Sequence, residues 1–130
     1  MTVTRSEYPE SIEDRLPVEE TEQTIASNKV EGTPVYDAHG ERIGKIHNFM
    51  VDKQSGRVVY AVMSFGGLLG MGASYRPLPW SVLRYDEKLD GYVVGIDMDT
   101  IRNGPSYEAG GEPRFDQGYY GTVYGYYGLI

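Results

Sequence analysis

Residues 57–65 read RVVYAVMSF. Every position except the first and the eighth is apolar, so an extended strand here carries apolar side chains on both of its faces. The valines and aromatic residues within it are residue types that favour strands. A strand of this kind lies at the centre of a sheet, or turns one face toward a partner. We therefore expect residues 57–65 to form a strand that is either central in the sheet or covered on one face by a partner.

Turns rich in aspartate and glycine lie on both sides of this strand. Residues 37–40 read DAHG, residues 52–56 read DKQSG and residues 90–91 read DG. Turns of this composition connect antiparallel strands, and Gly40 supplies the positive φ angle that the first of them needs.

The apolar period is broken in the segment before the second turn, ERIGKIHNFMVD. Ile46 and Phe49 do not fit one period of two residues, which indicates a β-bulge near His47 and Asn48. A bulge there sharpens the bend of a small, closed sheet.

Later segments predict an edge strand and one short helix. In SYRPLPW, Pro77 and Pro79 prevent continuous ladder pairing, so this strand lies at an edge or runs along the rim of a barrel. MDTIRN is followed by Gly104 and Pro105, which is typical of a helix of one or two turns. About five or six short strands joined by such turns predict a mainly β fold, either a small antiparallel barrel or a strongly coiled sheet.

Charge and composition divide the chain into three segments. Residues 1–28 hold seven acidic and two basic residues, without hydrophobic periodicity, and predict an acidic, flexible N-terminal arm. Residues 29–107 hold nine of each charge and all the clear strand patterns, so they form the expected domain. Residues 108–130 contain six glycines and five tyrosines and predict a flexible Tyr/Gly-rich tail without helix or strand period.

Four groups of motifs, in this order and spacing, resemble the PRC-barrel family across residues 32–107. Each motif is weak alone, and the combination is specific. The motifs are GTPVYDAHGERIG, DKQSGRVVYAV, SFGGLLGMG, and PWSVLRYD with the following DGYVV and NGPSY.

The resemblance implies a small antiparallel PRC-type β-barrel of about six strands, with a short helix after the last strand and flexible tails. It also implies a non-enzymatic role. The same module occurs in the photosynthetic reaction-centre H subunit and in a ribosome-maturation factor, which contacts a ribosomal protein. This chain lacks the membrane helix of the first and the extra N-terminal domain of the second, so neither role carries over.

The glycine-rich loop SFGGLLGMGAS does not match a phosphate-binding motif. A P-loop needs a lysine and a hydroxyl directly after its glycines, and here Ala73, Ser74 and Tyr75 follow. The dinucleotide fingerprint must lead from a strand into a helix, and this loop leads into a proline-containing strand. The glycines are interpreted as a wide connection between strands. Its large apolar residues, which seldom remain in water, predict a contact between subunits. These are Leu68, Leu69 and Met71.

No catalytic, cofactor or metal site is expected. The two histidines, His39 and His47, stand near Asp37 and Asp52, but their spacing does not direct them to one point. With no cysteine, the chain has no thiolate nucleophile and no disulfide framework.

The tyrosines of the tail leave several interpretations open. The segment is disordered, adds as a strand to an exposed edge, or lies across the barrel or a second subunit with its rings buried and its hydroxyls bonded. Stacking on nucleic acid needs basic charge, and the tail offers only Arg114. The tail residues assigned to the expected interaction surface are Tyr119, Tyr120 and Tyr124.

The sequence therefore predicts a non-enzymatic adaptor that binds other proteins and self-associates, with a dimer as the expected state. Nucleic acid is not an expected partner, because the body of the chain carries no net charge. No segment has the apolar length of a membrane helix and no signal peptide is recognised, so the cytoplasm is the expected location. Two alternatives stay open: a ligand- or metal-sensing module that uses the histidines, and an accessory factor in RNA processing or ribosome maturation.

Overall fold

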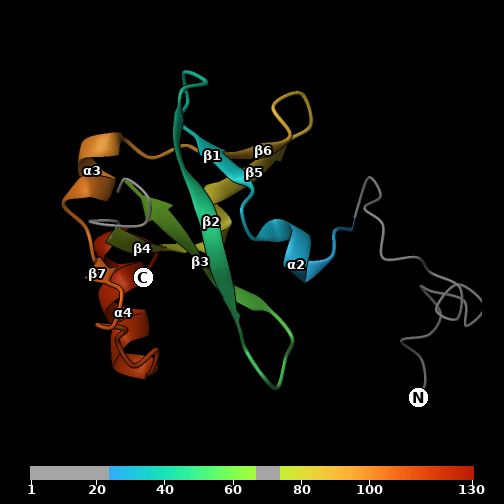
Figure 1. Ribbon diagram of the computed structural model, residues 1–130. Coiled ribbons are helices and arrows are strands. Elements are labelled where there is room, and N and C mark those ends of the chain that lie inside the picture. Colours follow the sequence, from blue (N-terminus) through green and yellow to red (C-terminus); the bar gives the residue numbers. More distant parts are fainter. Residues whose placement is uncertain (1–23, 67–73) are drawn as a thin grey trace, which may run out of the picture. The chain divides into compact units, whose positions relative to one another are not determined.

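The computed structural model describes residues 24–66 and 74–130 (Figure 1). The chain divides into two units between residues 30 and 31. In the first unit, the described residues form the short helix α2 (Ser27–Val30). The predicted acidic arm falls mostly outside the described residues, and the boundaries drawn at 28 and 107 stay predictions.

The second unit is a mixed β-sheet with short helices. In the described residues, seven strands pair in the order β5-β6-β1-β2-β3-β4-β7. The strands are β1 (Pro34–Tyr36), β2 (Arg42–Val51), β3 (Val58–Phe65), β4 (Ser74–Pro79), β5 (Leu83–Asp86), β6 (Gly91–Val94) and β7 (Tyr107–Glu108). The helices are η2 (Trp80–Val82), α3 (Met98–Arg102) and α4 (Gln117–Tyr126).

The mainly β fold is confirmed, with two differences from the expected antiparallel barrel. The described strands number seven, and β1 pairs in parallel with β6, with Val35 opposite Tyr92. The β5–β6 hairpin docks beside β1 as a unit, and local turn residues do not determine the direction of such a long-range pairing. The end strands β5 and β7 each have one partner among the described strands, so hydrogen bonds do not close the sheet.

The central position of β3 is confirmed. β3 pairs along its length with β2 on one side and with β4 on the other. Its residues 60–63 are all buried, although alternate residues of a strand point to opposite faces. Both faces of this strand are therefore covered, as the apolar sequence predicts.

The predicted turns and bulge are present. The side chain of Asp37 accepts hydrogen bonds from the backbone N–H groups of His39 (2.8 Å) and Glu41 (2.9 Å), and Gly40 has a φ of +86°. The register of β2 against β3 shifts between Ile46 and Asn48, which confirms the bulge.

The two prolines of β4 lie at an edge, as predicted. β7 pairs only with Ser74 and Tyr75 of β4. Beyond these residues, Pro77 and Pro79 pair with β3 alone among the described strands.

The Tyr/Gly-rich segment differs from the prediction, because residues 117–126 form helix α4, which lies beside β4 (Figure 1). Glycine disfavours helices by about 1 kcal/mol per residue, and the composition therefore indicated no helix. Burial overrides this cost, since Val123 is completely buried.

Both ends of α4 are capped by side chains or backbone. Asp116 is the N-cap, and its carboxylate accepts a hydrogen bond from the N–H of Tyr119 at 3.0 Å. At the other end, the N–H of Leu129 donates to the carbonyl of Tyr124 (2.9 Å) and Gly128 has a φ of +75°. This is a Schellman motif, in which glycine adopts the left-handed conformation without strain. The caps define the helix although its glycines weaken it.

Gly44 of β2 lies against the backbone of β3. A methyl group at this position would contact the carbonyl oxygen of Ser64, and Cγ of Met63 at 3.2 Å. The backbone in the middle of a sheet can move away from an added methyl group only by weakening its hydrogen-bonded strand pairing.

We expect Gly44→Ala to lower the free energy of unfolding by about 1–3 kcal/mol, because the added methyl group overpacks the β2–β3 contact. Urea denaturation followed by circular dichroism measures the change. Gly95→Ala is the matched control: a methyl group there meets no described heavy atom within 4 Å, so stability should be unchanged or slightly higher. Equal losses in the two variants would contradict the steric argument.

Candidate interaction surface

Tyr60 of β3 forms the floor of an aromatic cluster. Its residue is 3% exposed, and its ring packs on those of Phe115 (5.3 Å between centroids), Tyr119 (6.3 Å) and Tyr124 (6.0 Å). The Phe115 and Tyr124 rings meet it edge-to-face, an arrangement that aromatic pairs favour. The segment that leads into α4, and α4 itself, thus cover the Tyr60 face of the sheet.

Two tyrosine hydroxyls of α4 donate hydrogen bonds to backbone carbonyl groups outside the helix. The hydroxyl of Tyr124 donates to the carbonyl oxygen of Val59 at 2.6 Å, and that of Tyr126 donates to the carbonyl of Thr100 at 2.6 Å. Of the interpretations considered for the tail, the structure thus shows α4 lying across its own sheet. The hydroxyls of Tyr124 and Tyr126 are bonded, whereas that of Tyr127 is buried without a hydrogen-bond partner among the described residues.

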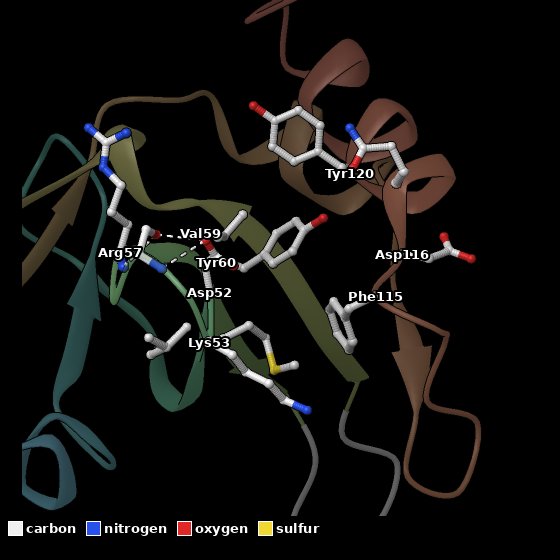
Figure 2. A pocket seen from close by; sticks show the side chains of 12 residues that line it. Asp52, Lys53, Arg57, Val59, Tyr60, Phe115, Asp116 and Tyr120 are labelled. Carbon is white, nitrogen blue, oxygen red and sulfur yellow. Dashed lines mark hydrogen bonds between the residues drawn. The ribbon is translucent and has the colours of Figure 1, made fainter.

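An open groove lies between the β2–β3 turn and the start of α4. It encloses about 760 Å³, which is within the range of about 300–1,000 Å³ that is common for ligand sites. Figure 2 shows Lys53 and Arg57 on the turn side and Phe115 and Tyr120 on the helix side, with Tyr60 between them. The lining residues are Met50, Val51, Asp52, Lys53, Ser55, Arg57, Val59, Tyr60, Phe115, Asp116, Gln117 and Tyr120.

The two carboxylates of the groove are held by their own loops. Asp52 accepts hydrogen bonds from the hydroxyl (2.7 Å) and the N–H (3.3 Å) of Ser55, and these bonds hold the pKa of Asp52 below its ordinary value. Asp116 is occupied as the N-cap of α4, and in Figure 2 its carboxylate points away from Tyr60.

The two cations of the groove have no such partner. Lys53 and Arg57 are exposed, and neither side chain makes an ion pair or hydrogen bond within the described part of the chain. A ligand with acidic groups can therefore reach both without breaking a contact that the described residues make.

The structure brings together three of the residues assigned to the expected surface. Tyr119 and Tyr124 pack on Tyr60, and Tyr120 stacks on Tyr124 at 4.2 Å and lines the groove. The other three lie outside the described residues: Leu68, Leu69 and Met71.

Sequence reasoning missed most of the groove. Tyr60 and Phe115 were not assigned to a surface, nor were Val51, Lys53 and Arg57. One available signal was the spacing in the tail: aromatic or apolar residues recur three, four and seven positions after Tyr120, which is a helical period.

The histidines do not converge on a metal site. His47 packs its ring on Tyr75 at 4.5 Å, and His39 lies in the exposed turn described above. Within residues 24–66 and 74–130, no three histidine, cysteine, aspartate or glutamate side chains gather closely enough to hold a metal ion. The described residues give no support to metal sensing.

A mixed sheet with tight Asp/Gly turns and a central strand covered on both faces defines a small β module. The family model of the PRC-barrel domain matches residues 22–100, and the chain belongs to this family. The family is generally non-catalytic and suggests a small module for protein interaction. Comparison with curated proteins finds no match. None of the helices in the described residues has the length and apolar character needed to cross a membrane.

The family match ends before the helix side of the groove begins. Thr100 is the last matched residue, whereas Phe115, Asp116, Gln117 and Tyr120 follow it. One wall of the groove therefore comes from the family domain, and the other comes from the additional C-terminal segment.

We expect Tyr124→Phe to lower the free energy of unfolding by about 1–2 kcal/mol, because the carbonyl of Val59 loses its hydrogen bond while the ring remains. Tyr120→Phe is the matched control on the same helix, since its hydroxyl makes no hydrogen bond to a described residue. Urea denaturation of both variants checks this, and a larger loss for Tyr120→Phe would contradict it.

The buried tyrosines also predict sensitivity to alkali. Burial raises the pKa values of Tyr60, Tyr107 and Tyr127 to about 12, because the phenolate loses hydration. In the unfolded chain these groups ionise near about 10. The folded state therefore binds more protons above that pH, and stability is full below about pH 10 and falls as pH rises toward about 12. Near-ultraviolet tyrosinate absorbance and circular dichroism, followed together, should show delayed ionisation coupled to unfolding. Complete ionisation with an intact fold would contradict this.

Proposed function

We propose that this protein is a non-enzymatic interaction module of PRC-barrel type that binds other proteins and self-associates. The observation that carries the proposal is the open groove, in which half-buried aromatic rings lie beside two exposed cations that have no ion-pair partner among the described residues. Surfaces that combine aromatic area with a polar rim are typical of protein recognition.

Self-association is assigned to the apolar residues of the glycine-rich loop and to the tyrosines of α4. The proposed residues are Leu68, Leu69, Met71, Tyr119, Tyr120 and Tyr124. For the loop the support is residue type, because three large apolar side chains among glycines are costly to leave in water. The cytoplasm is the proposed location, which the cysteine-free sequence permits.

We expect light scattering coupled to size-exclusion chromatography to give about twice the mass of the 14.5 kDa chain at micromolar concentration. Leu69→Glu should shift the protein to monomer, because a carboxylate in an apolar contact costs several kcal/mol.

Lys88→Glu is the control, since Lys88 is an exposed residue of the β5–β6 turn. A wild-type protein that is monomeric at all concentrations would refute self-association. Loss of the dimer in the control alone would refute the assigned residues.

A further inference from the structure

The groove between the β2–β3 turn and α4 leaves apolar surface without a described partner. Val51 is 44% exposed on its turn side, and Phe115 and Tyr120 are half-buried on its helix side. All three line the same groove as Tyr60, and Figure 2 shows Tyr60 beside Phe115 and Tyr120. One aliphatic or aromatic side chain inserted here would remove apolar area on both partners from water.

The charges of the groove select the chemistry around that side chain. Asp52 and Asp116 accept hydrogen bonds from their own loops, whereas Lys53 and Arg57 are exposed and free of ion pairs within the described residues. The ligand groups that gain most are therefore carboxylates placed opposite the two cations.

The same balance argues against a nucleic acid. A nucleic-acid surface needs clustered basic charge to release counterions, and this lining carries two cations beside two carboxylates. A peptide, in contrast, can carry acidic residues opposite the cations and an apolar residue over the floor.

We propose that this groove binds a short acidic peptide segment of another protein, in which aspartate or glutamate residues flank one aliphatic or aromatic residue. The inference rests on the proposed function as an interaction module and names the class of partner. The helix side of the groove lies beyond the family match, so the specificity belongs to this chain and not to the family domain as a whole.

A random peptide library presented to the full-length protein tests the proposal without assuming a partner. We expect the enriched sequences to carry acidic residues next to leucine, isoleucine, phenylalanine or tyrosine. Enrichment of basic or purely polar sequences, or no enrichment, would overturn the proposal.

The enriched peptide is then titrated against variants by fluorescence anisotropy. Lys53→Glu combined with Arg57→Glu should weaken binding about tenfold or more, because like charges then face each other. The matched control, Arg42→Glu combined with Lys45→Glu, makes the same change of charge at exposed positions of β2 outside the groove lining, and should change affinity less than about twofold. Equal losses in the two double variants would overturn the proposed site.

A neutral double variant and a variant of the apolar side test the charge and the apolar contact separately. Lys53→Gln combined with Arg57→Gln removes the cations without adding charge and should also weaken binding, and circular dichroism shows whether each variant is folded. Val51→Ser should weaken binding while Lys53 and Arg57 remain, and unchanged affinity would refute the apolar anchor.

The oligomeric state separates this inference from the proposed function. If the groove variants become monomeric while Leu69→Glu does not, the occupant is a second copy of the chain, and the acidic-peptide proposal is wrong. If peptide binding fails while Leu69→Glu still dissociates a dimer, the groove inference fails alone. Failure of both peptide binding and self-association would refute the interaction module itself.

Discussion

The burial of β3 on both faces is the constraint on which the rest of the structure depends. Residues 60–63 are buried in succession, and an antiparallel sheet often leaves one of its faces to water. A strand that is apolar on both faces requires cover on each. On the Tyr60 face the cover comes from residues 115–124. Within the described part of the chain, these residues supply all the aromatic ring contacts of Tyr60. The most glycine-rich end of the chain is thus the part that completes the hydrophobic core.

The same cover also produces the groove. β2 and β3 are the longest described strands, with ten and eight residues, and in Figure 1 the turn that joins them projects past the other strands. Phe115 and the first turn of α4 face the turn end of this hairpin, and the Tyr124–Val59 hydrogen bond holds the helix beside it. The groove therefore forms because a long hairpin lies beside the start of a helix of ten residues.

The local features of the fold were predictable, because each has a local cause. The two-sided apolar pattern of residues 57–65 indicates a central strand, the broken period between Ile46 and Phe49 indicates the bulge, and two prolines indicate an edge. The parallel pairing of β1 with β6 and the groove were not predictable in this way. They join segments distant in sequence, and no turn or period encodes that contact. Helix α4 falls between these cases. The helical spacing of its aromatic and apolar residues is present in the sequence, but its glycine content argues against a helix.

The two prolines of β4 have a further consequence for how the protein meets its neighbours. Proline has no N–H group, so positions 77 and 79 leave no unpaired donor along this edge of β4, and both residues are completely buried. Edge-to-edge strand pairing between molecules, which can lead to fibrils, is therefore disfavoured along this edge.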